Sequence, residues 1–156
     1  MKTIIVGMGN TILSDDGVGI LVARDLMERL ADYPYYEVME TPLAGMNLIP
    51  MLEGYDRAII IDAIEVSNPV PGTLHNFDLS ELAATMHVTS PHGTNLYTAV
   101  ELGRRCGLQM PGKITIFAIE VENVTTFSSE CTPAVEKCIT EVAEEIIRYL
   151  KTESNG

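Results

Sequence analysis

The chain has 156 residues, a length typical of one domain, and its hydrophobic content of 46% is enough for a substantial core. Its 22 acidic and 10 basic residues give a net charge of −12, which repels nucleic-acid phosphates and anionic lipid headgroups. We therefore expect neither nucleic acid nor membrane as a partner.

Three cysteines without a CxxC pair indicate neither a disulfide framework nor a structural zinc site, and they favour a cytoplasmic location.

The first half of the chain alternates short apolar runs with amphipathic segments. Strands are expected at residues 4–8, 36–40 and 57–62. Helices are expected at residues 16–30 and 46–52, the second capped by Gly54. The first apolar run is too short for a signal peptide or a spanning helix. The run at 57–62 is apolar until Asp62, its last residue, which predicts a strand at the centre of a sheet.

The second half continues the alternation and closes with a long helix. Strands are expected at 73–77 and 114–119, with a short segment at 79–84 between them. Ser90 to Gly93 is expected to form a loop before a helix that starts at Thr94 or Asn95. Thr132-Pro133 starts the closing helix. This pattern predicts a single three-layer α/β domain over residues 1–152, with a largely parallel sheet between helices and a flexible tail at 153–156.

Three segments place polar side chains just after expected strands, where ligands bind in open α/β sheets. They contain Asp16, Asp62 and His92. Each has a structural alternative: Asp16 can cap a helix, Asp62 can bind backbone, and His92 can be an ordinary loop histidine. Together they supply two carboxylates and one imidazole, a set suited to nickel or zinc. His87 is a reserve ligand, and His75 is expected to be structural.

Other chemistries have weaker support. Gly7-x-Gly9 lacks the third glycine of the dinucleotide fingerprint, and Asp15-Asp16 would repel a pyrophosphate there. The sequence contains no GxSxG elbow and no HExxH helix. Cys106 and Cys138 lie on amphipathic segments, where packing in the core is the expected role.

Four segments in order resemble one protein family, the hydrogenase maturation proteases, which trim the C-terminus of the large subunit of nickel-iron hydrogenases. They are Gly7 to Gly19 (GMGNTILSDDGVG), Ala44-Gly45-Met46, Ile60 to Ala63, and Ser90 to Gly93. The first segment is the most specific. The resemblance implies a twisted five-stranded sheet and a cytoplasmic endopeptidase.

The resemblance also implies a nickel-recognition site formed by Asp16, Asp62 and His92. The nickel would be supplied by the large-subunit precursor, with zinc or another divalent ion as a substitute. Many relatives carry an aspartate and two glycines after the second strand, and that aspartate is implicated in cleavage. Here the stretch reads Glu40-Thr41-Pro42, so Glu40 is the candidate general base, with a surface glutamate at a strand end as its alternative.

Two other functions remain open at this point. A protein that binds the nickel-containing subunit without cutting it would need no nucleophile motif. A metal-dependent hydrolase of a small molecule would hold metal tightly and need no protein partner.

Overall fold

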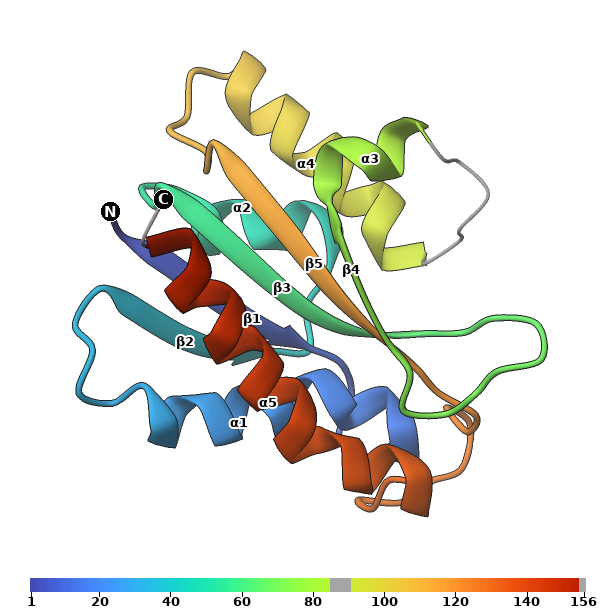
Figure 1. Cartoon of the computed structure of the whole chain (residues 1–156). Coiled ribbons are helices and arrows are strands. Elements are labelled where there is room, and N and C mark those ends of the chain that lie inside the picture. The colour runs from blue at the N-terminus through green and yellow to red at the C-terminus, as the bar shows by residue number, and fades with distance from the viewer. Residues whose placement is uncertain (85–90, 155–156) are drawn as a thin grey trace.

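The computed structural model describes residues 1–84 and 91–154, and it contains one sheet in the order β2-β1-β3-β5-β4 (Figure 1). The strands are β1 (Thr3–Met8), β2 (Tyr36–Thr41), β3 (Arg57–Ile64), β4 (Leu74–Asp78) and β5 (Lys113–Glu120). The helices are η1 (Ser14–Gly17), α1 (Val18–Arg29), η2 (Gly45–Leu48), α2 (Ile49–Leu52), α3 (Leu79–Ala84), α4 (Pro91–Arg105) and α5 (Pro133–Ser154). The predicted three-layer α/β fold with a five-stranded, largely parallel sheet is confirmed.

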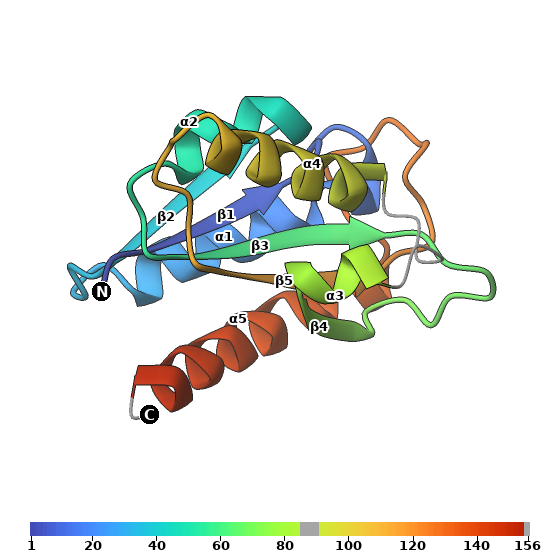
Figure 2. The same ribbon diagram turned by 90° about the horizontal axis from the view of Figure 1, so that it is seen from above.

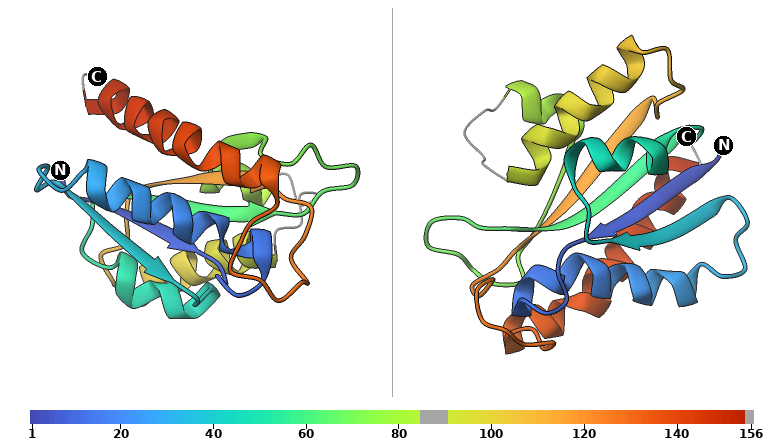
Figure 3. Two further views of the ribbon diagram at one scale, coloured as in Figure 1. Left: turned by 90° about the horizontal axis from the view of Figure 1, so that it is seen from below. Right: turned by 180° about the vertical axis from the view of Figure 1, so that it is seen from behind.

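The sheet separates two apolar clusters, one on each face. Helices α1 and α5 lie side by side on one face (Figures 1 and 3), where Val22 and Ile146 pack against Ile59 and Phe117. Helices α2, α3 and α4 cover the other face (Figure 2), where Leu52 and Leu96 pack against the sheet. Because both faces are covered, β1 is buried along its whole length, as its continuous apolar run predicts.

Four strands run parallel, and only the edge strand β4 runs the other way. β1 pairs with both β2 and β3, and β3 pairs with β5, all in parallel, whereas β4 pairs with β5 in an antiparallel ladder. The segments that follow β1, β2, β3 and β5 therefore all leave the sheet at its carboxyl edge. None of the helices in residues 1–84 and 91–154 has the length and apolar character that crossing a bilayer requires.

Several elements extend beyond their predicted bounds. β3 continues through Ile64, so Asp62 lies inside the strand and does not end it. α4 begins at Pro91, before the predicted start, so His92 lies in its first turn and not in a loop. α5 continues to Ser154, so Glu153, which was predicted as tail, lies in the helix and forms ion pairs with Lys113 and Arg57. Cys138 is buried as expected, but Cys106 is exposed and the prediction of core packing is wrong there.

Candidate functional site

The candidate site lies at the carboxyl edge of the sheet between β1 and β3. These strands are neighbours, but the chain after β1 leads away to β2 whereas the chain after β3 leads toward β4 and β5. Such a reversal of strand order opens a crevice in which α/β proteins bind ligands. The ladder between β1 and β3 ends at the pair Gly7 and Ile61, one residue before Asp62.

Asp16 is held at this edge by a tight turn between β1 and α1. The backbone N–H of Asn10 donates to Oδ2 of Asp16 over 3.0 Å and to its carbonyl oxygen over 3.3 Å. Gly9 adopts a φ of 148°, and a Cβ there would lie 2.0 Å from the Asp16 carbonyl oxygen, so the turn requires glycine. Asp16 is half-buried, and its role in fixing the turn agrees with the capping alternative.

Asp62 is buried, with 5% of its surface exposed, in the central strand of the sheet. One carboxylate oxygen accepts a hydrogen bond from the backbone N–H of Ala63 over 2.9 Å. Side chains alternate along β3: Ile61 packs on the face of α1 and α5, and Ile60 and Ile64 pack on the opposite face. Asp62 therefore points toward the face covered by α2 and α4.

His92 lies at the amino-terminal end of α4, but its side chain is outside the described residues, as is the whole of His87. α4 leads into β5, which runs parallel to β1 and β3, so the start of α4 lies toward their carboxyl ends (Figure 2). Among the side chains that the structure describes, no group of three His, Cys, Asp or Glu is arranged to hold a metal ion. Asp16 and Asp62 thus come to one edge of the sheet, together with the backbone of His92.

Glu40 lies on β2 in register with Gly7, and the structure does not bring it together with Asp62. Its carboxylate forms a two-point ion pair with Arg24 of α1, at 2.7 and 2.9 Å. This contact puts Glu40 on the face of α1 and α5, opposite the face toward which Asp62 points. The hydrogen bond and charge of Arg24 hold the pKa of the Glu40 carboxyl below its usual range. A carboxylate held in this way is a weaker base.

Asp15 is a structural residue of the site that the sequence did not distinguish from its neighbour. It is fully buried, and its carboxylate accepts backbone N–H bonds from Glu122, Asn123 and Thr132, the shortest at 2.7 Å. The Thr132 hydroxyl donates to the same carboxylate. Asp15 therefore ties the segment after β5 to the segment after β1. The sequence shows two adjacent aspartates. Which of them is structural depends on contacts with residues more than 100 positions away.

Two thiols near this region are poor nucleophiles. Burial, with the negative charge of Asp15 as a further cause, raises the pKa of Cys131 to about 12. Burial, with a contribution from the carboxylate of Glu141, raises the pKa of Cys138 to about 11. Both remain protonated near neutral pH, which agrees with the absence of a covalent catalytic motif.

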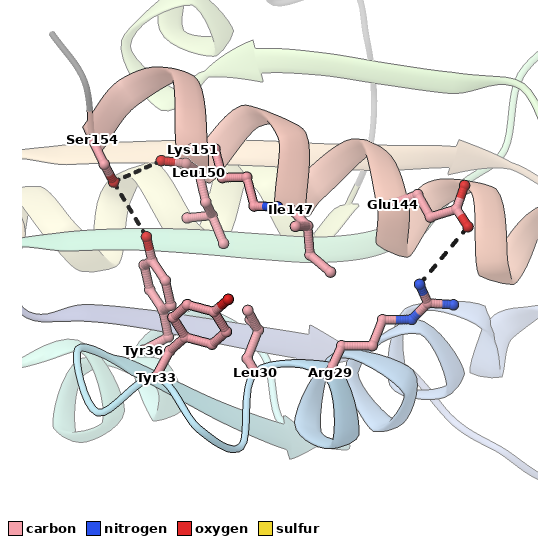
Figure 4. Close-up of a pocket in the computed structure, with 9 residues that line it drawn as sticks. All are labelled: Arg29, Leu30, Tyr33, Tyr36, Glu144, Ile147, Leu150, Lys151 and Ser154. Carbon is pink, nitrogen blue, oxygen red and sulfur yellow. Dashed lines mark hydrogen bonds and ion pairs between the residues drawn. The ribbon is translucent and has the colours of Figure 1, made fainter.

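A groove of about 580 Å³ lies elsewhere, between the carboxyl-terminal ends of α1 and α5 (Figure 4). Leu30, Ile147 and Leu150 point into it, and an ion pair between Arg29 and Glu144 borders it. Tyr36, the first residue of β2, also lines the groove, so the groove lies at the amino edge of the sheet. The groove is therefore separate from the candidate site.

The fold and the crevice define a class, the open α/β proteins that bind ligands at the carboxyl edge of a parallel sheet, and comparisons give the family. The family model described as "Hydrogenase maturation protease" matches residues 20–149. The hydrogenase 2 maturation protease of Escherichia coli K12 is 28% identical over 152 residues, covering 97% of this chain and 92% of the relative. HupD of Rhodobacter capsulatus, a hydrogenase expression/formation protein, is 23% identical, with coverage of 96% and 71%.

Solved structures agree with this result. The hydrogenase maturating endopeptidase HybD from Escherichia coli has a TM-score of 0.80 at 27% identity, covering 98% of this chain and 94% of that one. The HybD protease from Thermococcus kodakarensis shares the fold, with a TM-score of 0.73 at 20% identity and coverage of 96% and 99%. The chain belongs to the hydrogenase maturation protease family and is a peptidase.

Proposed function

We propose that this peptidase removes the C-terminal extension of a nickel-iron hydrogenase large-subunit precursor, and does so only after nickel has been installed. The observation that carries the proposal is the position of Asp16 and Asp62 on either side of the crevice between β1 and β3. Family membership supports the hydrogenase large subunit as the partner. In this scheme the peptidase tells a nickel-loaded precursor from an unloaded one because these two carboxylates contact the metal.

We propose Asp16, Asp62 and His92 as the residues that contact the nickel. Two carboxylates and an imidazole are donors that nickel and zinc both accept, and they leave coordination positions for ligands from the precursor. The buried carboxylate of Asp62 supports this assignment, because an ionised group away from water is stabilised by a cation. In this scheme the metal arrives with the substrate.

The assignment of Glu40 as general base stays a prediction of the sequence. Its ion pair with Arg24 and its place on the opposite face of the sheet from Asp62 favour a structural role. We therefore expect Glu40→Gln to retain cleavage within about threefold of the unchanged protein, as a residue outside the reacting centre does. A loss of about a hundredfold with unchanged precursor binding would instead establish Glu40 as the base.

The test is intact-mass spectrometry of large-subunit precursors incubated with this protein, with and without nickel loaded. We expect loss of a short C-terminal peptide from the nickel-loaded form only. Cleavage of both forms would contradict nickel sensing. Stable binding without loss of mass, using precursors that their own processing enzymes cleave, would favour the non-cleaving chaperone.

A further inference from the structure

The segments around the candidate site carry exposed apolar side chains. Ile12 follows β1, Leu43 and Met46 follow β2, Val70 follows β3, and Phe127 follows β5. Since these four strands are parallel, the four segments border the same edge of the sheet (Figure 2). Phe127 is 82% exposed and Ile12 is 56% exposed. Apolar side chains gathered in this way at one edge indicate a surface that binds a protein.

Ile12 and Phe127 are held next to each other by backbone pairing between their segments. The N–H of Ser128 donates to the carbonyl oxygen of Ile12 over 3.0 Å, and the N–H of Ser14 donates to the carbonyl oxygen of Ser128 over 2.9 Å. Leu13 and Ser128 form the parallel bridge between these two bonds. The two exposed side chains therefore belong to neighbouring residues of one paired structure.

The turn that carries Phe127 is also fixed internally. The side-chain oxygen of Asn123 accepts N–H bonds from Thr125 and Thr126, and its amide donates to the Thr126 hydroxyl over 2.9 Å. Asp15 binds the N–H of Asn123 from the other side. A turn fixed before binding loses little entropy when a partner docks, so an exposed phenylalanine on it is an efficient anchor.

The charged residues in the segments around this anchor are all acidic. The four segments, residues 9–17, 42–48, 65–73 and 121–132, contain no lysine or arginine. They contain Glu65, Glu122 and Glu130, which are exposed, and Asp16, which is half-buried, besides the fully buried Asp15. A complementary surface on the partner is therefore apolar at its centre and basic around it.

We propose that Ile12 and Phe127 form a preformed apolar anchor that docks on an apolar, basic surface of the large-subunit precursor, next to its metal. The inference rests on the proposed function for the identity of the partner. It adds the surface by which the precursor is recognised, separate from the residues that contact nickel.

The test compares the double variant Ile12→Thr/Phe127→Ser with the unchanged protein on nickel-loaded precursor. Steady-state cleavage, followed by intact mass, should show KM raised about tenfold or more and kcat unchanged, because the anchor acts in binding. The matched control is Tyr35→Ser, which removes a 65% exposed aromatic side chain beside the start of β2, at the opposite edge of the sheet. The control should leave KM unchanged.

Direct binding of the precursor to immobilised protein separates this inference from the proposed function. If the unchanged protein cleaves nothing, the proposed function fails, and the binding measurement still decides the anchor. Weaker binding of the double variant supports the anchor formed by Ile12 and Phe127. Equal binding, or an unchanged KM, overturns this anchor, provided that circular dichroism gives the double variant the same melting curve as the unchanged protein.

Discussion

Asp15 and Asp16 are neighbours in the sequence with different surroundings in the structure. Asp15 is fully buried and its carboxylate is surrounded by donors from the segment after β5. Asp16 is half-buried, and within the described part of the chain its side chain accepts one hydrogen bond, from Asn10. The first holds two loops together, and the second is the one available at the crevice.

This difference predicts different effects on stability. Asp15→Ala removes a fully buried acceptor of the backbone N–H groups of Glu122, Asn123 and Thr132, so the free energy of unfolding should fall by about 3 kcal/mol. Asp16→Ala removes one hydrogen bond of the capping kind and should lower the free energy of unfolding by about 1 kcal/mol. Urea denaturation of the two variants checks both values. Equal losses would show that Asp15 does not have the structural role assigned to it.

The thiols give a prediction about reactivity. Because the pKa values of Cys131 and Cys138 are raised to about 12 and about 11, little of either is thiolate at about pH 8, and alkylation should be slow. Cys106 is exposed and should react first. Iodoacetamide labelling mapped by mass spectrometry measures the order, with urea-unfolded protein as the control in which all three react. If Cys131 were labelled as fast as Cys106, the predicted order of reactivity would be contradicted.

At the scale of elements, the close contact of α1 with the sheet positions the site. A Cβ at Gly19 would lie 2.4 Å from the carbonyl oxygen of Ile61 and 2.5 Å from that of Met8, both backbone atoms. The first turn of α1 therefore lies directly against β1 and β3, one residue from Asp62 on the latter. Small residues at such contacts let the helix approach where a methyl group would separate it.

Gly19→Ala should therefore lower the free energy of unfolding by about 2 kcal/mol or more, because backbone atoms cannot move aside. Gly103→Ala in α4 is the matched control: the three atoms nearest to its Cβ would all belong to the Met110 side chain, the first at 2.9 Å. The control should stay within about 1 kcal/mol, since a methionine can shift and alanine favours the helix. Thermal melts measure both, and similar losses would contradict the tight contact at α1.

The sequence predicted the elements well where the pattern was local. The apolar run of β3 and the helical spacing of α5 were enough to find both. It did not predict that β3 continues past Asp62, where the alternation goes on to the buried Ile64. It also left open which face of the sheet Glu40 occupies, because this depends on the register of β2 and on Arg24 from α1. Contacts between distant segments, such as those of Asp15, leave no local pattern in the sequence and so could not be predicted from it.

On the scale of the whole molecule, the charges are unevenly placed. The four segments at the carboxyl edge contain acidic residues and no lysine or arginine, whereas the amino edge has both signs, with Lys2 paired to Glu37 and with Arg57 and Lys113 paired to Glu153. A basic partner surface would therefore be drawn to the edge that carries the candidate site. Attraction of this kind acts mainly on the rate of association and weakens with salt.

Glu122→Lys should slow association with the precursor by about threefold or more at low salt, with the effect decreasing as salt is added. Glu28→Lys, at an exposed position on α1, changes the net charge by the same amount away from this edge and should have a smaller effect. Stopped-flow or surface-based kinetics measure both rates. Equal slowing would mean that net charge alone is responsible.

The most direct test of the account is the cleavage of nickel-loaded precursor by Asp62→Asn, followed by intact mass. The variant keeps an oxygen to accept the Ala63 N–H bond but loses the negative charge that we propose contacts the nickel. Glu65→Gln, which removes an exposed carboxylate at the same edge, is the control. We predict that Asp62→Asn leaves the C-terminal extension in place while folding and melting normally, and that Glu65→Gln cleaves like the unchanged protein. Cleavage by Asp62→Asn at the unchanged rate would contradict the role of this carboxylate in recognising nickel.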